Sequence, residues 1–597
     1  MIELACAERS APAPLEARAA RAVDRVHLGS LAACTLALCA LVPYANALRA
    51  GFAFDDWIQI WGHPAFRNGI DWWAVLAAPL FPGDLYRPLT VATFAWDFAL
   101  AGRQAWWFHA VNLALHAAVT LLVAATAGRL FRSARVAWLA GALFAVHPVH
   151  TEAVTGVVGR AELLVALCGF LALLAAEQAI IAKSARAYRG WMAASLLSFL
   201  CALFAKENAL VWLPLILLYR IARRHEGWAA SLRREVRSLD WVAYAACVAV
   251  YLFMRFLVVG PVPPGAGVDF ADNVLAHVPA PMRVLTALAV LTESVSQFVF
   301  PLVLSADYSY PQVVPVASLS DPRVWLGLML IVAAVATFVV RRDSLGYAAI
   351  FPLLALALTA NLLFPIGTVR AERLWYLPSA GLCWLAALGL SAVISDPPRR
   401  LAVGLALLLL GLYAVRTWVR NEDWRDQPTL FAATARDAPH SSKAQKNHAV
   451  ELQRAGEHAQ AAAAYLRAWQ LYPRDEGAAF GLATAYEHLS RFDEALTWYD
   501  RALEIDPRHR GAHRNRCRLL IGLARWEEAE RACRAGLRVT PDDADLWKGL
   551  GLTWKELGLA ERAKAAFAAA ARLDPNDRAV RTLAESLPQA GPEEVRP

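Results

Sequence analysis

Two adjacent carboxylates, Asp55 and Asp56, interrupt an apolar and aromatic stretch that reads FAFDDWIQIW. They follow the first long apolar segment of the chain, in an expected loop. A carboxylate in such a loop can act as a general base toward a hydroxyl group. Because neighbouring residues of an extended chain point in opposite directions, only one of the pair can face a reacting atom. By spacing alone, the pair could equally well cap a helix that begins at Trp57.

Further ionisable residues lie in short connectors between later apolar segments. HPVHTEAVTGVVGRAE (147–162) and FAKEN (204–208) are flanked by apolar segments too short to cross a membrane fully, so their side chains should lie at membrane depth. Ionisable groups at that depth are costly unless they face water, a partner or a ligand. The candidate residues on this face are His147, His150, Glu152, Arg160, Glu162, Lys206, Glu207, Arg255, Arg370 and Arg373.

A carboxylate beside clustered cations indicates proton removal next to a bound anion, and phosphate is the anion that fits best. Taken singly, each cation could instead extend to the lipid headgroups. His147 and His150, three residues apart, could ligate a metal ion, but no third ligand is evident, so we assign no metal site. Cys517 and Cys533 could form a disulfide in an oxidising compartment, although we expect two buried thiols.

The composition indicates the elements that must position these residues. The chain has 597 residues, of which 58% are hydrophobic and 18% charged, and this is typical of a polytopic membrane protein. The formal net charge of +8 comes largely from short Arg clusters between apolar segments. Such clusters are expected on the cytoplasmic side of a membrane, so we predict no nucleic-acid partner.

The apolar segments predict about eleven spans between residues 29 and 420. We expect the segment 284–304 to be a re-entrant or surface-lying helix, and 71–81 to lie in the headgroup layer. Three spans (134–149, 191–205 and 208–221) are shorter than the roughly 20 residues that a membrane crossing needs. Their connectors should therefore surround a recessed polar cavity. The predicted spans are 29–48, 109–127, 134–149, 161–182, 191–205, 208–221, 239–259, 323–340, 345–365, 374–394 and 401–419.

The chain divides into a membrane half and a charged C-terminal half. We predict a cytoplasmic leader (1–28), a transmembrane domain (29–420), a linker (421–441), a repeat domain (442–580) and a flexible tail (581–597). The Arg-rich connectors place the N-terminus in the cytoplasm. An odd number of spans then places the C-terminal half on the opposite side, together with the candidate residues.

The C-terminal half contains a repeat of 34 residues. Proline recurs at 439, 473, 507, 541 and 575, with alanine and aromatic positions in phase. This period is that of the tetratricopeptide repeat, a pair of helices of which at least three are needed to bury a continuous core. Four repeats form an α-solenoid that would bind a protein or peptide, or act as a structural cap.

Several motifs together resemble a known family. FDDW, YRPLT, FHAVNLALH, HPVHTEAVTGVVGRAELL, FAKEN, DYSY and AERLWYLPSAG, followed by tetratricopeptide repeats, are similar to those of the transmembrane and tetratricopeptide-repeat-containing O-mannosyltransferases. The resemblance implies a GT-C membrane glycosyltransferase fold and a polyprenyl-phosphate-linked sugar as donor, with no other cofactor firmly implied. It also implies Asp55 as the base, with Asp56 orienting either that base or the acceptor. It places Arg373 on the donor phosphate, with Lys206 and Arg160 as helpers.

We therefore predict an enzyme that moves mannose or another hexose to a hydroxyl acceptor, the Ser or Thr of a protein, on the outer face of a bacterial inner membrane. Inversion is expected, since a retaining route requires a second carboxylate as nucleophile. One alternative is a non-catalytic membrane scaffold whose repeats assemble proteins. Another is a transporter, although we find no internal symmetry of the kind that transporters show.

Overall fold

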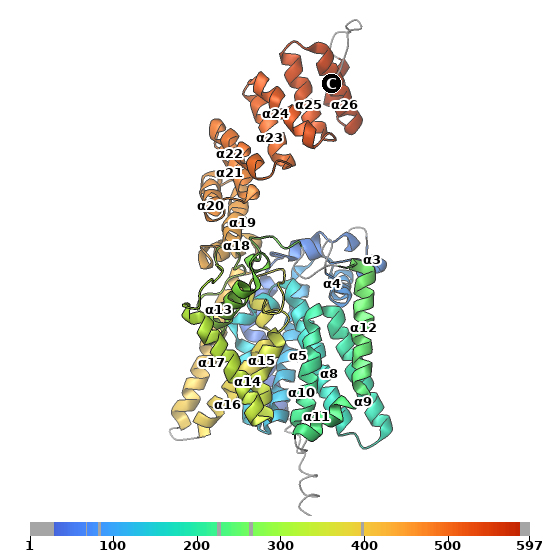
Figure 1. Ribbon diagram of the computed structural model, residues 1–597, viewed down its shortest axis with the longest axis vertical. Helices are drawn as coiled ribbons and strands as arrows, with labels where there is room; N and C mark the ends of the chain where they lie inside the picture. Colours follow the sequence, from blue (N-terminus) through green and yellow to red (C-terminus); the bar gives the residue numbers. More distant parts are fainter. Residues whose placement is uncertain are drawn as a thin grey trace, which may run out of the picture.

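The computed structural model describes residues 29–66, 69–80, 85–223, 228–261, 267–395 and 399–585. The predicted leader and residues 586–597 of the predicted tail lie outside these ranges. The described residues form helices and contain no strand, which confirms the mainly α class. Figure 1 shows an upright bundle of helices, with a curved array of helix pairs standing on one of its ends.

The bundle is built from long apolar helices. Within the described residues, eight helices are long and apolar enough to cross a membrane. They are Ser30–Arg49 (α2 and η1), Ala105–Phe131 (α5), Val157–Ile180 (η5 and α8), Ala185–Ala205 (α9), Asp240–Val259 (α12), Ala280–Val299 (α13), Pro322–Arg341 (α14) and Arg400–Asp423 (within α17, Arg399–Asp423). Shorter helices complete the bundle: α4 (Pro88–Ala101), α6 (Ala134–Val146), α10 (Trp212–Arg223), α15 (Ser344–Leu356) and α16 (Pro378–Ser395).

Helix α8 lies at the centre of the bundle, whereas α12 and α14 lie at its periphery. In the apolar stretch of Val157–Ile180, which contains most of α8, 67% of the residues are buried, against 11% in the corresponding stretches of α12 and of α14. The apolar side chains of the peripheral pair are therefore available to lipid. The close packing at the centre requires small residues. A Cβ atom at Gly169 of α8 would lie within 1.8 Å of the Trp212 indole, so only glycine lets α10 approach.

One predicted short span is wrong. We expected a span of 15 residues at 191–205, but α9 begins six residues earlier, at Ala185. Ser184 caps it by accepting a hydrogen bond from the Ala187 amide at 3.2 Å. The helix α10 is short as predicted, with 12 residues that rise only about 18 Å. The connector between α9 and α10 therefore still lies within the outer part of the bundle.

The connectors fall at two opposite ends of the bundle. The Arg-rich connectors, including α11 (Trp228–Val236), lie at the lower end in Figure 1, and the repeat array stands on the upper end. We call the upper end the outer end. Whether it faces away from the cytoplasm stays a prediction.

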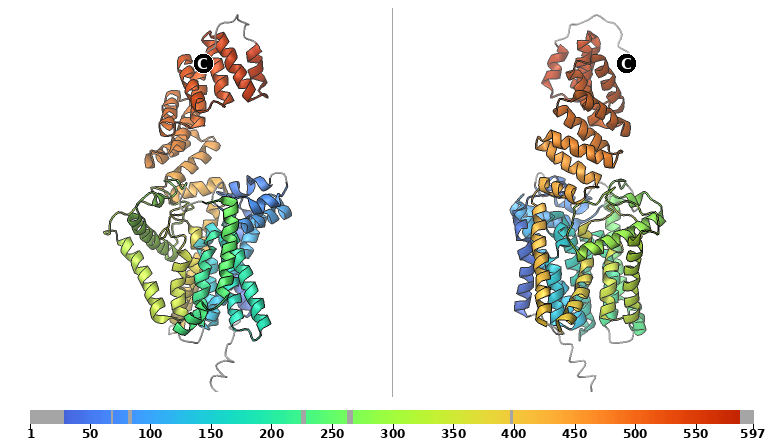
Figure 2. Two further views of the ribbon diagram at one scale, coloured as in Figure 1. Left: turned by 45° about the vertical axis from the view of Figure 1, so that its right-hand side comes forward. Right: turned by 90° about the vertical axis from the view of Figure 1, so that its left-hand side faces the viewer.

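Helix α13, in the segment that we predicted to be re-entrant, crosses the outer end of the bundle. Figure 2 shows it strongly tilted there, and the Thr292 hydroxyl donates to the Arg323 carbonyl at the start of α14 at 2.7 Å. The predicted headgroup-layer helix contains α3 (Trp72–Ala77), whose Trp73 is 79% exposed. Their depths in a membrane stay predictions.

The C-terminal half consists of paired helices, as the 34-residue period predicts. The pairs are α19 (Ser442–Arg454) with α20 (His458–Leu471), α21 (Glu476–His488) with α22 (Phe492–Ile505), α23 (Arg510–Gly522) with α24 (Trp526–Val539), and α25 (Ala544–Glu556) with α26 (Ala560–Leu573). The N-caps of the first helices repeat with the same period, at Ser441, Asp475, His509 and Asp543. A final helix, α27 (Arg578–Glu585), begins before the predicted tail and continues into it.

The membrane half continues into the repeats without an extended linker. Helix α17 is followed by α18 (Gln427–Asp437), so the segment predicted as a linker is largely helical. Asp426 and Thr429 form a capping box that starts α18.

The third repeat carries a disulfide between Cys517 and Cys533, with the two Cα atoms 5.2 Å apart. Our expectation of two free thiols is therefore wrong: the two helices of a repeat approach closely enough for the sulfurs to bond. Replacing both cysteines with serine should lower the stability of this repeat by about 3 kcal/mol, the value for a loop of about 15 residues. Hydrogen exchange of the amides of 510–539 in the full chain measures this loss. A Cys34→Ser variant serves as the control, and equal exchange in both variants would contradict the prediction.

Candidate active site

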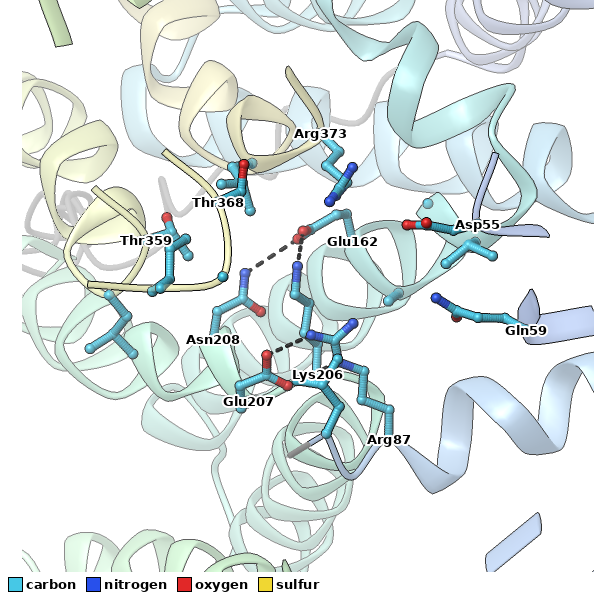
Figure 3. A pocket seen from close by; sticks show the side chains of 18 of the residues that line it. Asp55, Gln59, Arg87, Glu162, Lys206, Glu207, Asn208, Thr359, Thr368 and Arg373 are labelled. Atoms are coloured by element: carbon cyan, nitrogen blue, oxygen red, sulfur yellow. Dashed lines mark hydrogen bonds and ion pairs between the residues drawn. The ribbon is translucent and has the colours of Figure 1, made fainter. Parts of the chain in front are cut away.

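A cavity of ≈ 640 Å³ lies at the outer end of the bundle. Eight of the twelve candidate residues line it, namely Asp55, Asp56, Glu152, Glu162, Lys206, Glu207, Arg255 and Arg373. The structure adds further polar lining residues that were not among the candidates: Gln59, Arg87, Asn208, Thr359 and Thr368. Figure 3 shows Asp55, Glu162, Lys206 and Arg373 converging on this space from separate segments of the chain.

The acidic pair is divided by the backbone. Phe54 adopts a positive φ of 56°, a conformation that costs a non-glycine residue about 1–3 kcal/mol. The next residue, Asp55, is half-buried and lines the cavity, and no side chain or amide among the described residues hydrogen-bonds its carboxylate. Asp56 is 2% exposed and accepts hydrogen bonds from the amides of Ala53 at 3.2 Å and Val158 at 2.9 Å.

Among the residues that the structure describes, Asp55 alone therefore presents a carboxylate without a hydrogen-bond or ion-pair partner to the cavity, and Asp56 holds the loop. A side-chain N-cap at Asp56 is not formed, although a helical turn, η2 (Trp57–Trp61), follows. The loop is also held from outside, because the Gly51 amide donates to the Arg425 carbonyl at 2.8 Å. The loop that carries Asp55 is thus held by the connection between α17 and α18, which leads into the repeat array.

The buried Asp56 predicts a dependence of stability on pH. Burial raises its pKa to about 7, so between about pH 4 and 7 this carboxyl ionises in the unfolded chain but stays protonated in the fold. The fold binds the extra proton in that range, so its stability falls as pH rises through the window. In an Asp56→Asn variant this component of the slope should be absent. Melting temperatures of both proteins in detergent from pH 4 to 8 measure it, and parallel curves would contradict the prediction.

Arg373 lies above the cavity on a short helical turn, η8 (Glu372–Trp375), and is anchored by Glu152. The Arg373 amide donates to Glu152 at 2.9 Å, and its guanidinium forms an ion pair with the same carboxylate. Burial lowers the pKa of Arg373, but Glu152 and Asp55 outweigh this and hold the pKa above its usual value. Asp55 and Arg373 thus interact electrostatically across the cavity.

Two further ion pairs line the opposite wall. Lys206, at the end of α9, pairs with Glu162 of α8, and the Asn208 amide donates to the same carboxylate at 3.3 Å. Arg87 forms a two-point interaction with Glu207, at 2.9 Å and 2.6 Å. Each cation is held in place by a carboxylate and still reaches the cavity. Such fixed cations need little reorganisation when an anion binds between them.

The remaining walls come from α12 and from the segment after α15. Tyr251, Leu252 and Arg255 of α12 line one side. The segment 358–368 lines another, and the buried Asn361 holds it by donating to the carbonyls of Thr368 at 3.1 Å and Val369 at 3.2 Å. No pattern in the sequence indicated that Asn361 would hold this segment in place.

Two predicted cations do not line the cavity, so their predicted placement is wrong. Arg160 is fully buried, pairs with Asp97 of α4, and donates to Asn112 at 2.7 Å. Arg370 pairs with Glu293 at 3.1 Å and lies over the ring of Tyr308. Each ties helices of the bundle together. The sequence locates the backbone of Arg160 but not the direction of its side chain. Gly159 and Ala161 line the cavity, whereas the side chain of Arg160 points away from it.

The two predicted histidines also lie outside the cavity lining. His147 shares a hydrogen bond with the Phe298 carbonyl at 2.9 Å and stacks on the Phe298 ring. His150 is hydrogen-bonded to the Ser379 hydroxyl at 2.8 Å. Both connect the outer turns of the bundle to each other. Among the residues that the structure describes, no three His, Cys, Asp or Glu side chains are grouped as metal ligands.

The fold and the cavity define a class: a polytopic helical membrane protein with a charged cavity at one end and a tetratricopeptide array beside it. Models of the tetratricopeptide repeat match residues 446–509 and 490–552. Among curated proteins, the chain is 28% identical over 588 residues to mouse "Protein O-mannosyl-transferase TMTC3", covering 89% of this chain and 63% of that protein. It is 28% identical to human "Protein O-mannosyl-transferase TMTC1", covering 76% of this chain and 56% of that protein.

Over most of its length, the chain is thus similar to TMTC-like transmembrane and tetratricopeptide-repeat proteins, and its C-terminal half carries the tetratricopeptide repeat. It spans about 63% of the length of mouse TMTC3. Two similar solved structures each match about a quarter of the chain. A MamA fragment from Desulfovibrio magneticus RS-1 is 21% identical, covers 24% of this chain and 81% of its own, and gives a TM-score of 0.23. YrrB, described as a tetratricopeptide-repeat protein with an unusual peptide-binding site, is 19% identical, covers 26% and 79%, and gives 0.24.

Proposed function

We propose that this protein is a membrane glycosyltransferase that moves mannose or another hexose from a polyprenyl-phosphate donor to a hydroxyl group of a protein. The observation that carries the proposal is the unpaired carboxylate of Asp55 in one cavity with the fixed cations Lys206 and Arg373. The names of the similar curated proteins support a glycosyltransferase.

In the proposed reaction, Asp55 takes the proton of the acceptor hydroxyl as the oxygen attacks the anomeric carbon. The bond from that carbon to the phosphate oxygen breaks, and its electron pair stays on the departing lipid phosphate. Arg373, Lys206, Arg87 and Arg255 surround the cavity and would stabilise the phosphate, so no general acid is required. A single displacement of this kind inverts the anomeric carbon.

The lining of one wall supports a lipid-linked donor. Leu252 of α12 lines the cavity and is 50% exposed on the peripheral, lipid-facing helix. Leu358 and Phe364 add further apolar lining from the segment after α15. A prenyl chain could therefore lie in the bilayer while its phosphate reaches the cations, as a charged headgroup on an apolar tail requires.

We propose that the cavity and the repeats face the periplasm of a bacterial inner membrane, with the N-terminus in the cytoplasm. Three features support this orientation. The Arg-rich connectors lie at the end opposite the cavity, the array stands on the cavity's end, and the third repeat carries a disulfide, which persists in oxidising compartments.

The experiment that tests the function uses purified protein in lipid nanodiscs. It is incubated with polyprenyl-phosphate mannose and polyprenyl-phosphate glucose, each labelled in the sugar, together with synthetic peptides that contain Ser or Thr. The proposal expects label on the hydroxyl of the peptide from at least one donor, with inverted configuration. Binding of partner proteins without transfer from either donor would favour the scaffold instead.

A further inference from the structure

The repeat array is docked against the outer loops of the membrane half at its first helix. The hydroxyl of Ser441, the N-cap of α19, donates to Asp307 at 2.6 Å, and the Ser442 amide donates to the Tyr310 carbonyl at 3.3 Å. Lys443 pairs with Asp272 at 2.6 Å. These contacts fix the start of α19 against the outer loops, and Figure 1 shows α19 just above the outer end of the bundle.

Aromatic packing strengthens the same junction. Phe270, from the loop after α12, stacks on Tyr472 of the first repeat with ring centroids 5.7 Å apart. Tyr310 meets Tyr472 edge-on at 5.9 Å. Three aromatic rings from two halves of the chain thus form one cluster, which resists rotation of the array relative to the cavity.

Lys443 links this junction to the proposed base. Burial lowers the pKa of Lys443, but the carboxylates of Asp307, Asp272 and Asp55 outweigh burial and hold its pKa above the usual value. The backbone also brings the junction and the cavity together, because the Asp272 carbonyl accepts a hydrogen bond from the Val369 amide at 3.4 Å, next to Thr368 of the cavity lining. Through its ion pair with Asp272, Lys443 therefore holds the first turn of α19, where the array begins, beside the cavity.

A groove of ≈ 530 Å³ begins one helical turn from Lys443. It lies between α19 and α21. Because Gly477 and Gly481 have no side chains, the α21 side of the groove stays open at these two positions. The amide side chain of Asn447 faces this groove and has no hydrogen-bond partner among the described residues. The lining residues are Lys446, Asn447, Val450, Gln453, Arg454, Tyr465, Gly477, Phe480, Gly481 and Thr484.

The chemistry of the groove fits an extended polypeptide. A side-chain amide offers one acceptor and two donor hydrogens, which match the carbonyl and amide groups of a peptide backbone. Phe480 and Val450 offer apolar contacts to its side chains. From Lys443 to Arg454 the helix rises about 16 Å, the length of about five residues of extended chain. The groove belongs to the repeat half, beyond the helices that could span a membrane, so a lipid chain is a poor fit.

We infer that the acceptor polypeptide lies extended in the groove between α19 and α21 and passes Lys443 to reach Asp55. This inference rests on the proposed function, since it names the path by which that acceptor enters. The groove would hold about five residues on one side of the modified hydroxyl. The array would therefore favour acceptors that have an extended segment of this length beside the modified residue, and would not merely bring the acceptor close to the membrane half.

The test fills the groove without weakening the fold. A Cβ atom at Gly477 would lie 3.2 Å from a side-chain oxygen of Asp475 and 3.5 Å from the end of Lys446, so small side-chain shifts accommodate it. Because leucine favours a helix over glycine, Gly477→Leu should fold at least as well as the wild type. The matched control is Ala565→Leu, an exposed small residue on α26 outside the groove.

Transfer is measured to 20-residue peptides that carry a single Ser or Thr, and to N-acetylserine amide, which is too short to occupy the groove. We expect Gly477→Leu to raise KM for the peptide at least about tenfold, with kcat and transfer to N-acetylserine amide unchanged. Ala565→Leu should match the wild type. Equal KM values in Gly477→Leu and wild type, or transfer to the small acceptor only, would overturn the inference.

The two hypotheses fail in different ways. Release of sugar from the donor to water requires Asp55 and the cations but no groove. If that release is absent, or is the same in Asp55→Asn, the proposed function itself is wrong. If the release depends on Asp55 but the peptide result is unaffected by Gly477→Leu, only the acceptor route is wrong.

Discussion

Replacing Asp55 with asparagine should lower the rate constant of sugar transfer by about 10²–10⁴-fold, the usual contribution of a general base. Asparagine keeps the size of the side chain but cannot accept the proton of the acceptor. Because no described group hydrogen-bonds the Asp55 carboxylate, the fold loses only its longer-range attraction to Arg373 and Lys443, and the melting temperature should change little. Single-turnover transfer of labelled sugar from the lipid donor, at saturating acceptor, measures the effect.

Asp56→Asn is the control for the neighbouring position. Its carboxylate is buried on the amides of Ala53 and Val158 and does not contact the reacting atoms, so this variant should alter stability more than the rate of proton transfer. A large loss of rate in Asp56→Asn with full activity in Asp55→Asn would show that the roles are reversed.

Replacing Arg373 with alanine should cost about 10²–10³-fold in the same rate constant. Charge develops on the departing phosphate in the transition state, and a fixed donor aimed at it contributes an effect of this size. Loss of the guanidinium would also leave Glu152, which is 2% exposed, without its charged partner. The rate is measured as for Asp55, together with the affinity for the lipid donor.

A double variant separates catalysis from this structural cost. In Arg373→Gln with Glu152→Gln, both charges are removed, so no buried carboxylate is left unpaired. We expect recovery of the melting temperature in the double variant but no recovery of the rate. If the rate returned with the stability, Arg373 would only position the connector and would not act on the phosphate.

The repeat half was the most predictable part of the chain from sequence. Its period of 34 residues fixes helix ends, caps and close contacts at once, because each repeat makes the same contacts with its neighbour. Asp475 and Asp543 illustrate this, since both cap the first helix of a repeat. The disulfide was not predicted, because sequence spacing does not tell how closely Cys517 and Cys533 approach.

In the membrane half, the sequence predicted the apolar helices themselves better than the residues at which they begin and end. The start of α9 was placed six residues too late, because the polar residues 185–190 do not look like part of a span. They form the first turns of a helix whose 21 residues are together long enough to cross a membrane. Composition indicates where a helix meets the bilayer, whereas local capping, here by Ser184, decides where it begins.

The candidate site shows the same limit at the level of side chains. Hydrophobicity and charge located the connectors that surround the cavity, and the carboxylate pair among them. These patterns do not predict whether an individual side chain points into the cavity or away from it. Arg160 therefore seemed equivalent to Lys206, although it is buried on Asp97, and Arg87 was passed over although it lines the cavity. Arg87 precedes Pro88 in the YRPLT motif, which was the signal available.

The most direct test of the central claim is a density map of the protein with a polyprenyl-phosphate sugar bound. The account predicts the phosphate within hydrogen-bonding distance of Arg373 or Lys206, with the anomeric carbon between the phosphate and the carboxylate of Asp55. A phosphate bound outside this cavity, or Asp55 on the same side of the anomeric carbon as the phosphate, would contradict it.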